Sequence, residues 1–253
     1  MSISRQFTTN REYLSDKVFR FFYEESLNNK ALSLIMNKVI SFDSSNVYAF
    51  GGVVRDIELK NTPSDIDLVF SGDRNEFNLL LEDLNGERLT KNKFGGFRIQ
   101  TNRLDIDFWH IEDTWAFSNN KVDNANNSTN NILKTTFFNW DAILFNLKER
   151  TLISNEYYYY DLYNRYLDIN LADNPNTIGS FSRIIKNVFY NHVKYLSKDV
   201  VGYLDKSFSD FNVIEIRDFY LEKNRKHDLQ IRQLIALYDK VSFIVEHNQR
   251  LKN

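Results

Sequence analysis

A pair of Asp-x-Asp segments constrains this chain more than any other feature of its sequence. The first, DIDLVF at residues 65–70, alternates polar and apolar side chains, which predicts a strand whose two aspartates share one face. The second, LDIDFW at residues 104–109, repeats the alternation after FRIQ, so residues 97–109 are expected to form a hairpin. The intervening apolar side chains would face the core. The same face of the predicted strands then carries four carboxylates, those of Asp65, Asp67, Asp105 and Asp107.

A glycine pair precedes these strands. Residues 47–50, VYAF, predict a short buried strand that runs into Gly51 and Gly52, and a helix should start at that turn. Bare glycine backbone lets N–H groups approach a phosphate, helped by the positive end of the helix. Arg55, in the first turn of that helix, would steady the phosphate charge. Carboxylates converging beside such a turn predict two divalent cations, Mg²⁺ or Mn²⁺, with a nucleoside triphosphate as substrate.

Composition places the chain among ordinary globular proteins. Its 253 residues suffice for one large or two small domains, with 42% hydrophobic and 26% charged residues. Cysteine is absent, which excludes disulfides and thiolate zinc sites. We expect a cytoplasmic protein without membrane contact, since there is neither a signal-peptide core nor an apolar run of about 18 residues. The net charge of −2 gives no general attraction to nucleic acid, so an RNA substrate would need a local basic patch.

Periodicity along the chain predicts two domains. Residues 10–41 are typical of two helices and residues 46–147 of an α/β catalytic core, which together make a domain of residues 1–150. Residues 151–253 predict a helical tail domain. Finer expectations are a helix at 74–84, an Asn-rich loop at 119–131, strand or buried-helix character at 135–147, and helices at 183–196 and 228–247. The tyrosines at 157–160 favour an edge strand, with base stacking as the alternative.

The last of these helices carries an apolar stripe at spacings of three and four, which predicts packing against the rest of the protein. The stripe consists of Ile231, Leu234, Ile235, Tyr238, Val241 and Val245.

Residues 51–70, GGVVRDIELKNTPSDIDLVF, resemble the signature of class II tRNA nucleotidyltransferases and bacterial poly(A) polymerases, within the DNA polymerase β-like nucleotidyltransferase superfamily. The resemblance continues through residues 94–109, FGGFRIQTNRLDIDFW. Residues 137–146, FFNWDAILFN, are more weakly similar to the family segment Asp-Phe-Thr-x-Asn-Ala. The resemblance implies an α+β fold: a polymerase-β-like head, with a mixed sheet and helices, followed by a short α-helical C-terminal domain.

The resemblance also implies roles for single residues. Asp65 and Asp67 would be metal ligands, and either Asp105 or Asp107 the third carboxylate, a choice that the sequence leaves open. The residues expected to serve the triphosphate, the order of the turn, or the ribose and nucleotide are Gly51, Gly52, Arg55, Asp56, Asn139 and Asp141.

The segment that selects the base in this family departs from its pattern here. It is echoed by Asp173 to Pro175 and by Arg183 and Lys186, where a lysine replaces an arginine and loses the planar fork used for paired hydrogen bonds. An exposed helix face explains Arg183 and Lys186 equally well. The base preference is therefore open.

Together these features predict a metal-dependent nucleotidyltransferase that releases pyrophosphate. The resemblance favours an RNA 3′ end, tRNA-like, as the acceptor. The short tail and net negative charge favour a small-molecule or protein hydroxyl instead. A catalytically silent nucleotide-binding module is the third hypothesis, and retention of all four aspartates argues against it.

Overall fold

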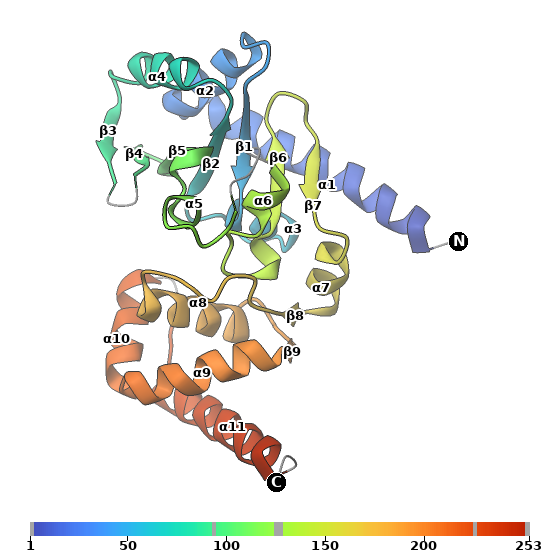
Figure 1. The fold of residues 1–253 in the computed structure, drawn as a ribbon, viewed down its shortest axis with the longest axis vertical. Helices are drawn as coiled ribbons and strands as arrows, with labels where there is room; N and C mark the ends of the chain where they lie inside the picture. Colours follow the sequence, from blue (N-terminus) through green and yellow to red (C-terminus); the bar gives the residue numbers. More distant parts are fainter. Residues whose placement is uncertain (1–2, 93–94, 124–128, 225–226, 251–253) are drawn as a thin grey trace. The chain divides into compact units, whose positions relative to one another are not determined.

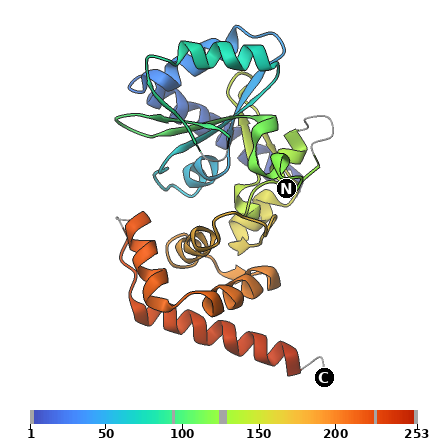
Figure 2. The ribbon, with the colours of Figure 1, turned by 60° about the vertical axis from the view of Figure 1, so that its left-hand side comes forward.

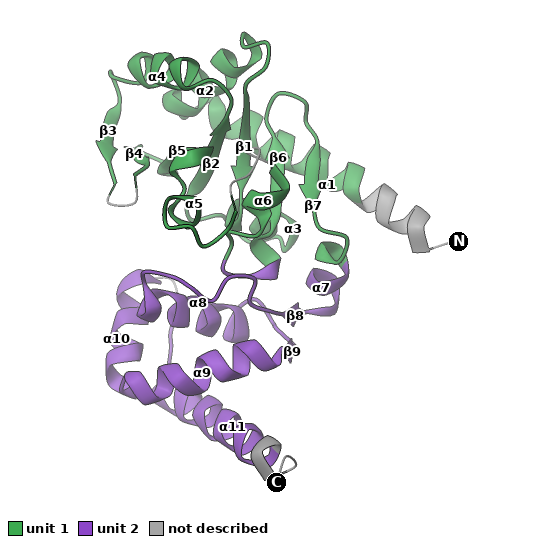
Figure 3. Ribbon diagram, in the orientation of Figure 1, with its two compact units in different colours: residues 1–136, 140–159 green, residues 137–139, 160–253 purple. Residues whose placement is uncertain are grey.

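The computed structural model describes residues 3–92, 95–123, 129–224 and 227–250. The chain divides into two compact units (Figure 3). Unit 1 comprises residues 1–136 and 140–159, and unit 2 comprises residues 137–139 and 160–253. The domain boundary expected from composition at residue 150 lies inside unit 1.

A mixed seven-stranded sheet is the centre of the described part of unit 1 (Figure 1). Its order is β3-β4-β5-β2-β1-β6-β7, in which β2 and β5 are parallel and the other neighbours antiparallel. The predicted hairpin of residues 97–109 is confirmed as β4 and β5. The strands are β1 (Asn46–Phe50), β2 (Ile66–Ser71), β3 (Arg88–Lys91), β4 (Phe97–Gln100), β5 (Ile106–His110), β6 (Ile143–Asn146) and β7 (Leu152–Ser154).

Two helices of unit 1, α2 and α4, begin at residues whose side chains cap them. The side chain of Asn29 accepts a hydrogen bond from the Leu32 N–H at 3.2 Å, so Asn29 is the N-cap of the second helix. Asp73 caps α4 in the same way. The helices are α1 (Ile3–Ser26), α2 (Lys30–Ile40), α3 (Gly52–Glu58), α4 (Arg74–Asp83), α5 (Trp115–Ser118) and α6 (Thr129–Leu133).

One face of the sheet is covered by helices α1, α2 and α4. Leu68 and Phe70 of β2 are fully buried, and the Phe70 ring packs on Phe77 of α4 with centroids 5.3 Å apart. Phe22 of α1 stacks on Phe145 of β6 at 6.2 Å. Helices α2 and α4 lie side by side over this face (Figures 1 and 2). The alternation predicted for β2 is therefore confirmed.

The opposite face is covered over part of its area. Val69 of β2 and Leu144 of β6 pack in a cluster with Phe117 of α5 and Ile132 of α6. Asp67, two residues before Val69, projects from the same face. The carboxylates thus lie on the face that the short helices α5 and α6 cover in part.

Some expectations for unit 1 are wrong in detail. Residues 129–131, expected in a loop, belong to α6, where Ile132 and Leu133 bury apolar side chains; residues 124–128 of that loop lie outside the described residues. The strand or buried-helix character expected for residues 135–147 is found in a strand at Ile143–Asn146 and a short buried 3-10 helix at Asn139–Asp141. Strand β3 lies in a segment for which the sequence suggested no element, because its residues are largely exposed and polar.

Unit 2 is mainly helical, as expected for the tail. Helix α7 (Tyr158–Asn164) crosses the division between the units. The elements that follow are β8 (Tyr166–Leu167), α8 (Thr177–Phe189), β9 (Tyr195–Leu196), α9 (Lys198–Asp210), α10 (Val213–Lys223) and α11 (Ile231–Arg250).

Two expectations for this region are wrong. The tyrosine run is the start of α7, not an edge strand: Tyr158, Tyr159 and Leu162 are buried at helical spacing, while Tyr157 and Tyr160 are exposed. The helix expected at 183–196 ends at residue 189.

Helix α11 is confirmed, but its packed stripe differs from the predicted one. Leu234, Leu237 and Val241 are buried, whereas Ile235 and Tyr238 are 46% and 45% exposed. Of the helices in the described part of the chain, none combines the length and apolar character needed to cross a membrane.

Candidate functional site

A row of side chains crosses the partly covered face of the sheet at one level. Register places Asp67 of β2 directly opposite Asp107 of β5, and Asp107 directly opposite Arg98 of β4. Directly opposed residues project from the same face, with neighbouring strands about 4.8 Å apart. On the other side of Asp67 the row continues through Phe50 of β1. Two carboxylates and one guanidinium therefore meet at the centre of the sheet.

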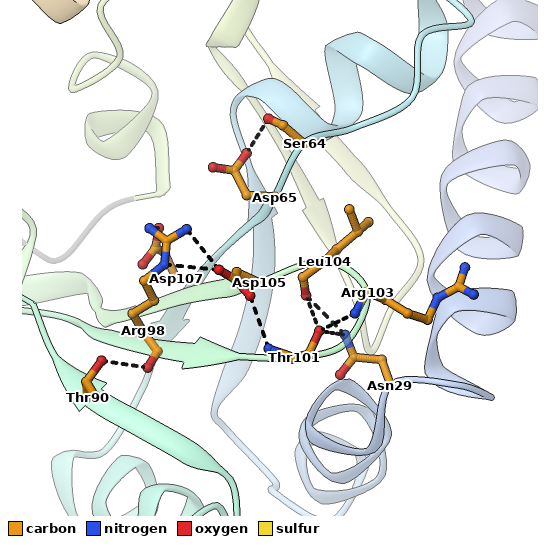
Figure 4. A network of polar contacts seen from close by, with 10 residues as sticks. All are labelled: Asn29, Ser64, Asp65, Thr90, Arg98, Thr101, Arg103, Leu104, Asp105 and Asp107. Carbon is orange, nitrogen blue, oxygen red and sulfur yellow. Dashed lines mark hydrogen bonds and ion pairs between the residues drawn. The ribbon is translucent and has the colours of Figure 1, made fainter. Parts of the chain in front are cut away.

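The remaining two predicted carboxylates flank this row. The Ile66 N–H donates to the Asp105 carbonyl at 2.9 Å, so Asp65 and Asp105 lie one step before β2 and β5. Each is two residues from its partner in the row and so projects from the same face. Figure 4 shows Asp65, Asp105 and Asp107 at this end of the strands, where Ser64 Oγ donates to Asp65 Oδ1 at 2.8 Å. The structure brings the four carboxylates to one face.

Arg98 joins two of these carboxylates, and sequence reasoning missed it. Its Nη1 donates to Asp107 Oδ2 at 3.2 Å, and its Nη2 and Nε donate to Asp105 Oδ2 at 3.3 and 3.4 Å (Figure 4). Asp105 Oδ1 accepts the Thr101 N–H at 3.1 Å. The signal was present, because a hairpin that pairs FRIQ with LDIDFW places the arginine opposite the aspartates.

The two aspartates differ in their surroundings. The Asp107 side chain is 14% exposed and that of Asp105 is 31% exposed. Burial raises the pKa of Asp107; Arg98 lowers it, and the charges of Asp65 and Asp105 raise it again. The net direction is upward, so one guanidinium does not compensate fully for burying this carboxylate among others. A further cation would therefore favour its charged form.

The donor set fits a hard divalent cation. Among the described residues, no three His, Cys, Asp or Glu side chains stand close enough as they are to hold a metal ion. The candidate ligands are nevertheless all carboxylates, which Mg²⁺ and Mn²⁺ prefer. A cationic group, the guanidinium of Arg98, already lies among them. For a metal ion to bind here, the carboxylate side chains would have to rotate toward the position that the Arg98 guanidinium occupies.

The glycine turn follows β1 directly, at the edge of the same row. Gly51 has φ +70° and ψ −127°, a conformation that side chains rarely adopt. Its N–H donates to the Ile143 carbonyl at 3.3 Å, so this group is engaged within the sheet. Gly52 is the first residue of α3, where the N–H has no acceptor within the helix. Of the glycine pair, Gly52 is the better placed phosphate donor.

Gly51→Ala is expected to lower the free energy of unfolding by about 1–3 kcal/mol, because alanine is strained at this positive φ. Urea unfolding followed by circular dichroism measures the change. Gly86→Ala is the matched control, since an added Cβ meets nothing within 4 Å there and no positive φ is required. Equal effects of the two substitutions would contradict the strain argument.

Arg55 is turned into unit 1 and buried. Its guanidinium pairs with Asp56 Oδ1 at 2.9 Å and with Asp141 Oδ1, and its side chain is 11% exposed. Burial alone lowers the pKa of Arg55, but attraction by Asp141 and then Asp56 outweighs burial, so its pKa is raised. These contacts tie α3 to the segment before β6. The roles of Arg55, Asp56 and Asp141 toward a nucleotide stay predictions.

Asn139 belongs to unit 2 and is buried there. Its Nδ2 donates to Asp161 Oδ2 at 2.9 Å, and its Oδ1 accepts the Asp168 N–H at 2.9 Å. Both ends of the amide thus order the chain around β8. A contact between Asn139 and ribose stays a prediction.

Arg183 and Lys186 lie on α8 of unit 2. Arg183 is exposed, its guanidinium lies 5.3 Å from the centroid of the Phe137 ring, and it donates to Ser180 Oγ at 3.2 Å. A guanidinium stacked on an aromatic ring is more ordered than one on a free helix face. Base recognition by Arg183 and Lys186 stays a prediction.

Residues 47–171 match the family model of the poly(A) polymerase head domain. This segment resembles the head domain of that family. The matched segment contains the glycine turn, the carboxylate row and Arg98, so the tRNA nucleotidyltransferase and poly(A) polymerase resemblance expected from the sequence is confirmed for the head domain. Among curated protein sequences, none matches the chain significantly.

Solved structures of nucleotidyltransferases share the fold of most of this chain, which includes the head domain and residues beyond it. A Thermotoga maritima CCA-adding enzyme complexed with tRNA is 20% identical with a TM-score of 0.60, covering 84% of this chain and 51% of its own. A CCA-adding enzyme in complex with CTP is 20% identical with a TM-score of 0.61; the match covers 89% of this chain and 55% of that enzyme. A tRNA nucleotidyltransferase with a primer tRNA and an incoming ATP analogue is 18% identical with a TM-score of 0.54, covering 79% and 58%.

These likenesses confirm the predicted α+β, polymerase-β-like nucleotidyltransferase fold with its mixed sheet. The chain spans about half the length of the solved structures that it matches. What the rest of those proteins contributes is therefore not carried over to this chain.

Proposed function

We propose that this chain is a divalent-cation-dependent nucleotidyltransferase. It moves a nucleoside monophosphate from a nucleoside triphosphate to an acceptor hydroxyl and releases pyrophosphate. The observation that carries this proposal is the direct opposition of Asp67 and Asp107, beside the Gly51–Gly52 turn, within a poly(A) polymerase head domain. The glycine turn that we propose to bind phosphate and the acidic side chains are thereby adjacent.

The chain would contribute positioning and charge, which phosphoryl transfer chiefly requires. Asp65, Asp67 and Asp107 would hold the cations, and the N–H of Gly52 would donate to the triphosphate. Two bound divalent cations, Mg²⁺ or Mn²⁺, would neutralise charge at the α-phosphate and activate the acceptor hydroxyl.

Asp107 is the better candidate for the third carboxylate, a choice that the sequence left open. It is directly opposite Asp67, whereas Asp105 lies before the start of β5. Asp105 also has both oxygens engaged, one by the Thr101 N–H and the other by Arg98. A ligand must give up such contacts, and among the described residues Asp105 accepts hydrogen bonds from Thr101 and Arg98, whereas Asp107 accepts one from Arg98.

Asp107→Asn is therefore expected to lower the transfer rate at least tenfold more than Asp105→Asn, on the scale of about 10²–10³ for losing one preorganised electrostatic contact. Single-turnover transfer from an α-labelled triphosphate, measured with both variants at saturating Mg²⁺, gives the comparison. The reverse order of the two variants would assign the third ligand to Asp105.

An RNA 3′ end, tRNA-like, is the acceptor that we propose. The support is that the solved structures sharing this fold include one in complex with tRNA and one with a primer tRNA and an ATP analogue. The base transferred and the number of nucleotides added are left to experiment, because Arg183 and Lys186 match the family's base-selecting pattern only in part.

Transfer of label from each of the four α-labelled triphosphates, with Mg²⁺ or Mn²⁺, tests the proposal. The acceptors are total tRNA, other RNA, and a cell extract separated into protein and small molecules; the Asp65→Ala/Asp67→Ala protein is the control. Label on tRNA that requires both aspartates is the expected result, and binding to tRNA should weaken steeply with salt. Label on protein or a metabolite would overturn the RNA acceptor. Nucleotide binding without any transfer would overturn the enzymatic function.

A further inference from the structure

Arg98 lies among the carboxylates that are proposed to bind the cations (Figure 4). We infer that Arg98 is a resident counter-cation, which neutralises Asp105 and Asp107 until a divalent cation displaces its guanidinium from Asp107. The inference rests on the proposed function, since it takes the same carboxylates to be the cation site. It gives Arg98 a role in controlling when that site fills.

When no metal is bound, the carboxylates of the row need another positive charge beside them. Parallel register sets Asp67 directly opposite Asp107, and like charges directly opposite each other destabilise a strand pair. Asp107 is also mostly buried, which deprives its charge of water. Arg98 stands directly opposite Asp107 on the other neighbouring strand, so its charge compensates at the same level of the sheet.

The contact between Arg98 and Asp107 is suited to exchange. Charge-assisted hydrogen bonds between a guanidinium and a carboxylate are about 2.7–2.9 Å long when fully formed. The contacts of Arg98 are 3.2 Å to Asp107 and 3.3–3.4 Å to Asp105, and its side chain is 41% exposed. The guanidinium is therefore loosely held and has solvent into which it can turn.

Asp105 would keep Arg98 nearby after the exchange. The Thr101 N–H fixes one oxygen of Asp105, which leaves the other directed at the guanidinium. A divalent cation carries twice the charge of an arginine, and Mg²⁺ binds oxygen ligands at about 2.0–2.1 Å, so a cation at this site would compete with Arg98 for Asp107. Asp107 would thus exchange Arg98 for the divalent cation, whereas Asp105 would keep its contact with Arg98.

This arrangement links the cation to the nucleotide. A bare cation must displace a positive group that gains no new partner, which weakens its binding. A cation that arrives with a triphosphate supplies phosphate oxygens, which guanidinium groups bind well. Arg98 thereby disfavours filling of the site by metal alone.

Binding of Mn²⁺ to the full chain without nucleotide tests the inference, with free Mn²⁺ measured by electron paramagnetic resonance. Removing a unit charge within a few ångströms of the site should strengthen binding, so Arg98→Gln is expected to lower the Kd for Mn²⁺ by about tenfold or more. Arg98→Lys keeps the positive charge but loses the planar fork of the guanidinium, so its Kd for Mn²⁺ should lie between those of the wild type and Arg98→Gln. Arg88→Gln is the matched control, because Arg88 is exposed on β3, opposite Gln100, and its loss changes the net charge equally.

Thermal unfolding is the second readout. In chelator, Arg98→Gln should have a lower Tm than the wild type, and saturating Mn²⁺ should raise the Tm of the variant more than that of the wild type. An unchanged or larger Kd for Mn²⁺ in folded Arg98→Gln would overturn the inference while leaving the proposed function intact. If the wild-type protein bound no Mn²⁺, or if Asp67→Asn left its Mn²⁺ binding unchanged, the inference and the proposed metal site would both be wrong.

Discussion

Replacing Asp67 with asparagine is expected to slow nucleotide transfer by roughly 10²–10³-fold. Asparagine keeps the shape of the side chain but removes the charge that a divalent cation needs at the centre of the row. Because Asp67 is directly opposite Asp107, the substitution also relieves repulsion between two carboxylates. The Tm of the metal-free variant should therefore equal or exceed that of the wild type. Single-turnover label transfer and thermal unfolding of the same preparations give both quantities.

Asp43→Asn is the control for the charge change, since Asp43 is exposed and precedes the start of β1, at the opposite end of that strand from Phe50 of the row. It should retain the wild-type transfer rate. A folded Asp67→Asn protein with an undiminished rate would remove Asp67 from the reaction. A loss of rate accompanied by a lower Tm would instead indicate that the carboxylate serves the sheet.

Alternation made the central strands of the sheet predictable. Ile66, Leu68 and Phe70 are all fully buried, as their spacing requires for one apolar face. Strand β3 gave no such signal, because neither of its faces is buried. Its place in the sheet depends on pairing with β4, a long-range contact that local sequence does not encode.

The aspartates of the site were predictable by residue, but their relation to one another was not. The sequence placed Asp105 and Asp107 on one face of a hairpin, and the structure agrees. The parallel pairing that sets Asp107, rather than Asp105, directly opposite Asp67 joins strands separated in the chain by α4, β3 and β4. Register of that kind follows from how the whole sheet assembles.

The helical region was harder to predict because packing partners decide which face of a helix is buried. The stripe chosen for α11 included Ile235 and Tyr238, which are exposed, and omitted Leu237, which is buried. Helices α9 and α10 pack against α11 and fix its rotation. Spacings of three and four fit several rotations equally well, so periodicity alone does not distinguish them.

Arg55 shows how a motif residue can be identified correctly while its contacts are not foreseen. The sequence placed it in the first turn of a helix and predicted a contact with phosphate. In the structure it is buried between Asp56 and Asp141, and the Asp141 partner comes from a segment remote in sequence. Removing one partner of a buried ion pair leaves an uncompensated buried charge, which costs about 3–5 kcal/mol.

Arg55→Met is accordingly expected to lower the free energy of unfolding by about 3–5 kcal/mol, measured by urea denaturation. Arg74→Met is the matched control: Arg74 also pairs with two carboxylates, Glu112 and Asp113, but its side chain is 39% exposed, so its loss should cost about 1 kcal/mol or less. Adding Asp141→Asn to Arg55→Met should restore part of the stability, because it removes one stranded charge. If Arg55→Met instead kept wild-type stability and weakened triphosphate binding, the phosphate role predicted from the sequence would be correct and the buried ion pairs would be secondary.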